Sequence, residues 1–117
     1  MVNYDLSERL LNFAVEVIFY CRQLENSIEN RIIKHQLIKA STSSGANYEE
    51  SQGASSKADF SNKIRISLKE MREANYWLKV ISKTIDNEDK KMELDHLLDE
   101  SEQLKRIFGS ILQKTGK

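Results

Sequence analysis

The sequence predicts an all-α protein, an antiparallel up-down-up-down four-helix bundle in which residues 1–117 form a single domain. Three observations favour this fold. The 117 residues include no proline and only four glycines, so the residues that most often interrupt helices are rare. Apolar residues recur at intervals of three and four, the period of one helix face. Helix-start signals divide the chain into four segments with short connections, which favours antiparallel neighbours.

The first two helices each have a start signal and one apolar face. Asp5 is the expected N-cap of the first helix, with Glu8 three residues later, and Asn26 with Glu29 repeats the pattern for the second. Gly53 is the expected stop of the second helix. The inward face of the first helix is expected to comprise Leu6, Leu10, Phe13, Ala14, Val17, Ile18, Cys21 and Leu24. That of the second is expected to comprise Ile28, Ile32, Leu37, Ala40, Ser41, Ser44 and Tyr48.

The last two helices are each expected to run for nearly 30 residues, or about 40 Å. Ser56 with Asp59 opens the third helix, and Asp86 with Asp89 opens the fourth. The tail from residue 115 to 117 is expected to fray. The inward face of the third helix is expected to comprise Phe60, Ile64, Met71, Ala74, Leu78, Ile81 and Ile85. That of the fourth is expected to comprise Leu94, Leu97, Leu98, Ser101, Leu104, Phe108, Ile111 and Leu112.

Composition narrows the range of functions that the chain could have. Eighteen Lys and Arg balance eighteen Asp and Glu, so any basic surface must be local. Cys21 is the only cysteine, which excludes an intramolecular disulfide, and its place on the apolar face predicts a buried, inert thiol. The sequence shows no signal peptide and no run of about 20 apolar residues. These features predict a cytoplasmic protein without membrane contact.

The sequence contains no recognisable catalytic motif. It lacks a phosphate-binding glycine loop, a Ser-His-Asp set, zinc-ligand spacing and a dinucleotide fingerprint. Glu93 and His96 have the spacing used in di-iron bundles, but those sites need two such motifs and two further glutamates. Both residues also lie off the apolar face, in expected contact with solvent. We therefore expect no enzymatic activity, no metal and no cofactor.

A run of small and polar residues lies on the inward side of the second helix. It spans residues 40–47, Ala-Ser-Thr-Ser-Ser-Gly-Ala-Asn. Small side chains allow helix axes to approach closely, and Gly45 costs a helix about 1 kcal/mol relative to alanine, which indicates a packing reason. Asn47 and Glu50 are expected either to join a structural hydrogen-bond network or to form a functional polar site at the centre of the bundle.

The third helix carries a basic stripe, which we define as Arg65, Lys69, Arg72, Lys79 and Lys83. At 100° per residue these five side chains fall within an arc of about 80°, and Tyr76 lies in the same arc. Residues 56–84 contain seven Lys and Arg against three acids, a net charge of +4. A row of cations with an aromatic residue suits nucleic-acid phosphates and a stacked base. The alternative is a solvated helix face.

Apolar residues also lie outside the inward faces. The first helix has Leu11, Val15 and Phe19 in such positions, and the third has Ile66, Trp77 and Val80. Exposed aromatic residues of this size are unusual on a monomer. We expect Leu11, Val15, Phe19 and Trp77 to lie at an interface between subunits. The alternative is a wider buried sector within one bundle.

Several segments resemble one family. They are Lys39–Ser51, with its Gly-Ala-Asn-Tyr-x-Glu core, and Lys57–Ile64, Ser67–Glu70 and Glu73–Leu78. Together they resemble the bacterial four-helix proteins encoded by intervening sequences in 23S ribosomal RNA genes, also called S23 ribosomal proteins. Many members have proline at the position of Gly45, and this chain resembles the glycine-containing branch.

The resemblance implies a homo-oligomer, a ring of five bundles. The family is similar to the accessory protein of diversity-generating retroelements, a pentamer that binds nucleic acid and a reverse transcriptase. The matching surface here is the basic stripe. We therefore expect a bundle that binds RNA or DNA through the stripe and Tyr76. The alternative is an accessory scaffold that holds a partner protein and no nucleic acid.

Overall fold

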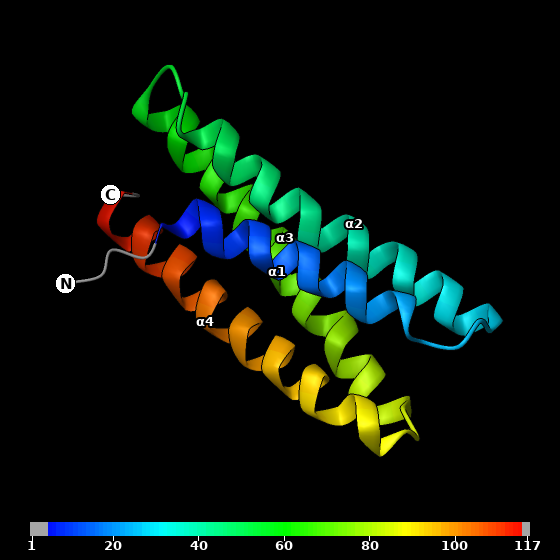
Figure 1. The fold of residues 1–117 in the computed structure, drawn as a ribbon. Coiled ribbons are helices and arrows are strands. Elements are labelled where there is room, and N and C mark those ends of the chain that lie inside the picture. The colour runs from blue at the N-terminus through cyan, green and yellow to red at the C-terminus, as the bar shows by residue number, and fades with distance from the viewer. Residues whose placement is uncertain (1–4, 116–117) are drawn as a thin grey trace.

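Four helices form an antiparallel up-down-up-down bundle (Figure 1), as the sequence predicts. The computed structural model describes residues 5–115. Consecutive helices pack against each other, and the last returns to contact the first. The start of α1 and the end of α4 therefore lie at the same end of the bundle (Figure 1). The elements are α1 (Leu6–Arg22), α2 (Ile28–Ser51), α3 (Lys57–Thr84), the 3-10 turn η1 (Glu88–Lys90) and α4 (Lys91–Thr115).

Side chains cap the helices, and two of the predicted caps are correct. The Asp5 carboxylate accepts from the Ser7 amide at 3.1 Å, and the Ser56 hydroxyl accepts from the Asp59 amide at 3.0 Å. The predicted cap Asn26 is wrong, because Ser27 caps α2 by accepting from the amide three residues later. Each serine places its oxygen within reach of the N3 amide.

The predicted cap Asp86 is also wrong. Asn87 accepts from the Asp89 amide at 2.9 Å and starts the 3-10 turn rather than a helix. The α-helix proper begins at Lys91 and has 25 residues, fewer than the nearly 30 expected, whereas α3 has 28. The expected fraying covers residues 115–117: Thr115 is the last residue of α4, and residues 116–117 lie outside the described part of the chain.

The core is apolar and continuous from helix to helix. In the first turns of α2 the predicted inward face is wrong: Ile28 and Ile32 are exposed, and Ile33 is buried instead. Ile33 lies one turn before Leu37 and two turns before Ala40, and these two buried residues set the phase of the helix. The largest buried side chains come from all four helices: Leu10, Phe13, Val17, Tyr20, Leu37, Ile64, Met71, Leu78, Leu94, Leu97, Leu104 and Phe108.

Serines join α2 to α3 inside this core. The Ser44 hydroxyl donates to the Ser67 carbonyl at 2.8 Å, and the Ser67 hydroxyl donates to the Ser44 carbonyl at 2.9 Å. Both residues are fully buried. Because the side chains are short and each satisfies the other helix, the two backbones approach closely without leaving a buried hydroxyl unpaired.

The contact between α1 and α4 is more polar. The Arg9 guanidinium donates to both carboxylate oxygens of Glu100, at 2.7 and 3.0 Å. Further along, His96 lies 3.3 Å from Glu16, and the Gln23 amide donates to Glu93 at 3.3 Å. We call this row the α1–α4 polar seam. Figure 1 shows α1 lying across the space between α2 and α4.

Candidate functional site

The basic stripe occupies the face of α3 that points away from the core. The buried face of α3 presents Ile64, Met71 and Leu78, which pack against α2 and α4. All five cations of the stripe, and Tyr76, are exposed. The sequence therefore predicted their exposure correctly, because the stripe lies on the opposite side of α3 from the buried residues.

Most of the positive charge of the stripe is uncompensated. Lys79 lies 3.7 Å from the Glu102 carboxylate of α4, which also pairs with Lys105 at 3.2 Å. The hydrogen bond from Lys105 and the neighbouring positive charges lower the pKa of Glu102, so its carboxylate stays ionised. Within residues 5–115, the other four cations of the stripe form no ion pair or hydrogen bond.

The acids of α3 are placed elsewhere. The Asp59 carboxylate accepts from the Ser55 amide at 3.2 Å, at the start of the helix, where it supports the cap. The Glu73 carboxylate accepts from the Trp77 indole N–H at 3.2 Å. Glu70 is the third acid of α3, and within residues 5–115 none of the three forms an ion pair with a cation of the stripe. The face therefore keeps its positive potential in a protein whose net charge is zero.

Tyr76 is an exposed aromatic side chain in the middle of this positive face. Its ring contacts that of Trp77 edge to face, with ring centroids 5.1 Å apart and an interplanar angle of 74°. Trp77 is in turn fixed by its hydrogen bond to Glu73 and packs against the core. Tyr76 remains 57% exposed, so the rest of its ring is open to a ligand.

The apolar residues expected at a subunit interface lie in two places. Leu11, Val15 and Phe19 form an exposed row on α1, with Leu11 63% and Phe19 54% exposed. We call this row the α1 patch. Trp77 is half-buried on α3 and does not belong to that row. Ile66 and Val80 are also half-buried.

Ile28 and Ile32 add apolar surface that the sequence did not predict, with exposures of 71% and 56%. Ile32 lies 18 residues before Glu50, about five full turns, so both point to the same side of α2. Glu50 reaches across to Lys63 of α3 at 2.7 Å. Trp77 follows Lys63 by about four turns and lies on that same side of α3. We call Ile28, Ile32 and Trp77 the α2–α3 patch.

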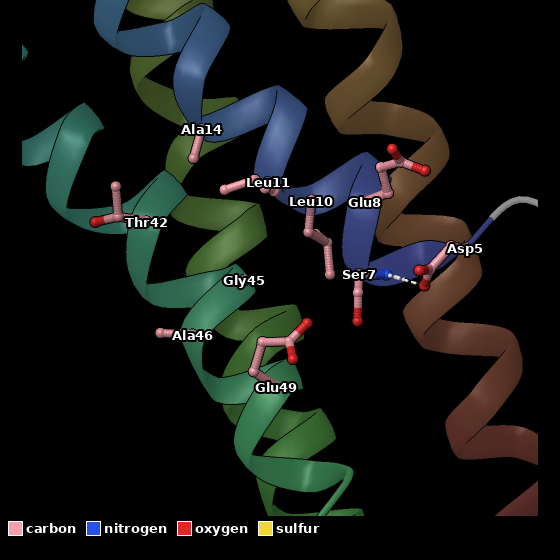
Figure 2. A pocket seen from close by; sticks show the side chains of 10 residues that line it. All are labelled: Asp5, Ser7, Glu8, Leu10, Leu11, Ala14, Thr42, Gly45, Ala46 and Glu49. Carbon is pink, nitrogen blue, oxygen red and sulfur yellow. Dashed lines mark hydrogen bonds between the residues drawn. The ribbon is translucent and has the colours of Figure 1, made fainter.

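A groove of about 690 Å³ runs between α1 and α2 beside the α1 patch (Figure 2). Its walls are mostly apolar, and carboxylates lie among the lining residues at the start of α1 and on α2. Figure 2 shows Leu10 and Leu11 on the α1 side of the groove and Gly45 and Ala46 on the α2 side. The lining residues are Asp5, Ser7, Glu8, Leu10, Leu11, Ala14, Thr42, Gly45, Ala46 and Glu49.

The expected polar set on α2 does not form one site. Gly45 faces α1, and a Cβ built on it would lie 3.4 Å from the Leu10 Cβ, an ordinary contact. The Asn47 amide donates to the Ser43 carbonyl of its own helix at 2.9 Å. Glu50 is exposed and pairs with Lys63. The three residues therefore point in different directions.

The buried polar network lies elsewhere and extends from α3 to α4. The Asn75 amide donates to the Ser101 hydroxyl at 2.7 Å, and Lys105 donates to the Asn75 carbonyl oxygen at 3.3 Å. Asn75 was absent from the predicted inward face of the third helix. Its position four residues after Met71 and three before Leu78 could have indicated it, because both are on that face.

Catalytic and metal chemistry find no support in the described residues. Glu93 and His96 are both exposed, as the helix phase predicts, and no group of three potential ligands gathers anywhere in residues 5–115. Cys21 is buried, and desolvation raises the pKa of its thiol to about 11, so the reactive thiolate is scarce at neutral pH. Within the same range, no helix is long and apolar enough to cross a membrane.

Comparison with known proteins agrees with the fold. The chain is similar to a crystal structure of a protein of unknown function from the S23 ribosomal protein family of Bacteroides thetaiotaomicron VPI-5482. The two are 30% identical with a TM-score of 0.78, over 91% of this chain and 96% of the other. No curated protein matches the chain. The family described as 23S rRNA-intervening sequence protein matches residues 3–111. This four-helix chain therefore belongs to the 23S rRNA intervening-sequence protein family.

Proposed function

We propose that the chain is a non-enzymatic subunit that binds RNA or DNA through the basic stripe. One observation carries the proposal: a row of five exposed cations, four of them without a partner in residues 5–115, on a protein with zero net charge. Unpaired cations on one face produce a local field that attracts polyanions, and a balanced net charge does not abolish it.

The length of the stripe suits a polyanion. Arg65 and Lys83 are 18 residues apart, which corresponds to about 27 Å along a helix. Three further cations fall between them at intervals of three, four or seven residues. A rigid helix of 28 residues therefore presents charges at fixed positions, and little side-chain ordering beyond the cations themselves is needed for contact.

A salt titration tests the proposal. Binding of structured RNA and of duplex DNA to the wild type is measured beside the variant Arg65→Glu/Arg72→Glu. Each phosphate contact contributes a slope of about −0.9 to a plot of log K against log salt for duplex DNA and about −0.7 for single strands. We expect the variant to bind at least tenfold more weakly and to lose about two contacts' worth of slope.

The control is Lys91→Glu/Lys114→Glu, which changes the net charge equally at two exposed positions of α4 outside the stripe. We expect it to bind almost as well as the wild type. If both variants lose affinity equally, net charge and not the stripe governs binding. If the wild type does not bind at low salt, the stripe is a solvated face, and a protein partner becomes the favoured function.

We also propose that the chain assembles with copies of itself. The supporting observation is that each chain carries two unlike apolar patches on different sides of the bundle. Gly45, which faces α1, and Glu50, which faces α3, are separated by about 140° around α2. The α1 patch lies near the side of α2 that faces α1, and the α2–α3 patch lies on the side that faces α3.

Unlike patches favour a head-to-tail contact, in which the α1 patch of one copy covers the α2–α3 patch of the next. Such contacts are heterologous, and they close into a ring when the rotation between copies divides a full turn. A ring of five is the form that the family resemblance implies. It would also present five basic stripes together, so that weak contacts by single stripes add to a high avidity.

A further inference from the structure

We infer that the basic stripe takes single-stranded nucleic acid in preference to a duplex, and that Tyr76 provides the surface on which one base stacks. This inference rests on the proposed function, because it requires that the stripe binds nucleic acid. It adds the class of ligand and a residue that discriminates between classes.

The first step is the position of Tyr76 within the row. Arg65, Lys69 and Arg72 precede it on α3, and Lys79 and Lys83 follow it. At 1.5 Å per residue, Tyr76 lies about 6 Å beyond Arg72 and about 4.5 Å before Lys79. A strand whose phosphates contact cations on both sides of Tyr76 must therefore pass beside the phenol ring.

The second step is that the ring is held in place. The edge-to-face contact with Trp77 limits the rotation of Tyr76, and the Glu73 carboxylate fixes the indole by accepting its N–H. Trp77 also packs against the core, so the support is anchored inside the bundle. A restrained ring that is still 57% exposed loses little rotamer freedom when a base stacks on it.

Single strands and duplexes differ in whether the faces of their bases are accessible to a tyrosine ring. Bases in a duplex are stacked on one another, so their faces are closed to a surface tyrosine, whereas the bases of a single strand are free to splay out and stack on aromatic side chains. A duplex would use only the cations of the stripe. A single strand would use the cations and Tyr76 together, which is the combination of a charged track and an aromatic platform found in single-strand sites.

The experiment compares a fluorescein-labelled 15-nucleotide oligouridine with a 15-base-pair RNA duplex by fluorescence anisotropy. Oligouridine is chosen because its own bases stack weakly. The variant Tyr76→Leu removes the aromatic face and keeps an apolar side chain, and Tyr76→Phe keeps the ring. Because both changes occur at an exposed position, neither is expected to affect folding.

We expect Tyr76→Leu to weaken oligouridine binding about tenfold, with the salt slope and the duplex affinity unchanged. Tyr76→Phe, which keeps the ring, should bind oligouridine as tightly as the wild type does. Trp77 is the only tryptophan, and its ring contacts Tyr76, so oligouridine should also change the tryptophan fluorescence of the wild type.

The outcomes separate this inference from the proposed function. If oligouridine and duplex bind with the same affinity and Tyr76→Leu weakens neither, the inference is overturned, while a salt-dependent affinity that needs Arg65 and Arg72 upholds the proposed function. If Tyr76→Leu weakens both ligands equally, Tyr76 does not discriminate and the inference again fails. If neither ligand binds at low salt, both the inference and the proposed function are wrong.

Discussion

Tyr20 is the largest fully buried side chain, and its hydroxyl has no hydrogen-bond partner among residues 5–115. An unpaired buried hydroxyl costs free energy that a partner would otherwise offset. Desolvation, together with the negative charges of Cys21, Glu93 and Asp95, raises the pKa of Tyr20 to about 12. Burial also raises the pKa of the adjacent Cys21 thiol to about 11. Two neighbouring residues of α1 thus resist ionisation.

We therefore predict that Tyr20→Phe raises the free energy of unfolding at pH 7 by about 1 kcal/mol, because it removes a buried hydroxyl without leaving a cavity. Urea unfolding followed by circular dichroism measures the change. A loss of stability at pH 7 would contradict the prediction and show that the hydroxyl is satisfied in solution, for instance by a buried water molecule.

The dependence of the free energy of unfolding on pH follows from the direction of these two pKa shifts. In the unfolded chain the two groups have pKa values of 10.0 for Tyr20 and 9.0 for Cys21, both below their folded values. The folded state therefore binds their protons more tightly, and this contribution is complete below about pH 9 and is lost as pH rises toward 12. The advantage of Tyr20→Phe over the wild type should grow above pH 10.

At the scale of elements, short side chains determine how closely α2 approaches its neighbours. The reciprocal bonds between Ser44 and Ser67 hold α2 against α3, and Gly45 on the next position turns toward Leu10 of α1. The run of small residues therefore serves two contacts on two sides of one helix. The sequence indicated close packing there but not which residue meets which helix.

We predict that Gly45→Ala stabilises the bundle by up to about 1 kcal/mol, because alanine favours helix and the added methyl would contact Leu10 at an ordinary distance. Gly45→Leu should instead destabilise by about 1–3 kcal/mol, since a larger side chain would force α1 away. Thermal unfolding of both variants beside the wild type checks this pair. A destabilising Gly45→Ala would mean that the helices approach more closely than described.

The helices themselves could be predicted because their apolar period is clear, but details that depend on neighbours could not. Asn26 and Ser27 are adjacent residues that both favour caps, so local sequence does not decide between them. Ile28 and Ile32 suit a core as well as a surface, and only the packing of Leu37 settles the phase of α2. Tyr20 was missed because a tyrosine is often half-exposed.

At the scale of the whole molecule, the position of the stripe could be predicted from the sequence, whereas the contacts between copies could not. The position of the stripe follows from the core, because residues opposite a buried face must be exposed. Whether the apolar patches meet depends on how two copies dock, and the helical periodicity of one chain does not reveal that geometry. The α2–α3 patch became visible only when the structure showed that Ile28 and Ile32 are exposed.

We predict that the wild type sediments as an oligomer and that Phe19→Glu and Ile32→Glu are each monomeric, because each places a charge in one of the two patches. Mixed in equal amounts, the two variants should form a dimer, since one intact α1 patch can still meet one intact α2–α3 patch. Analytical ultracentrifugation measures the species. Gln113→Glu, at an exposed position of α4 outside both patches, is the matched control and should leave the assembly unchanged.

Two results would contradict this assembly. A stable dimer formed by Ile32→Glu alone would indicate a symmetric contact through the α1 patch. A wild-type protein that sediments as a monomer would exclude self-assembly altogether.

The antiparallel course of the chain gives the stripe a direction. The start of α3 lies at the same end of the bundle as the start of α1, whereas the end of α3 lies at the opposite end (Figure 1). Among the cations of the stripe, Arg65 is therefore the nearest to a label attached at the start of α1, and Lys83 is the farthest. A nucleic-acid strand is itself polar, from 5′ to 3′. A cleaving reagent tethered at that end would cut near only one terminus of a bound strand if the protein reads polarity, and near both termini if it does not.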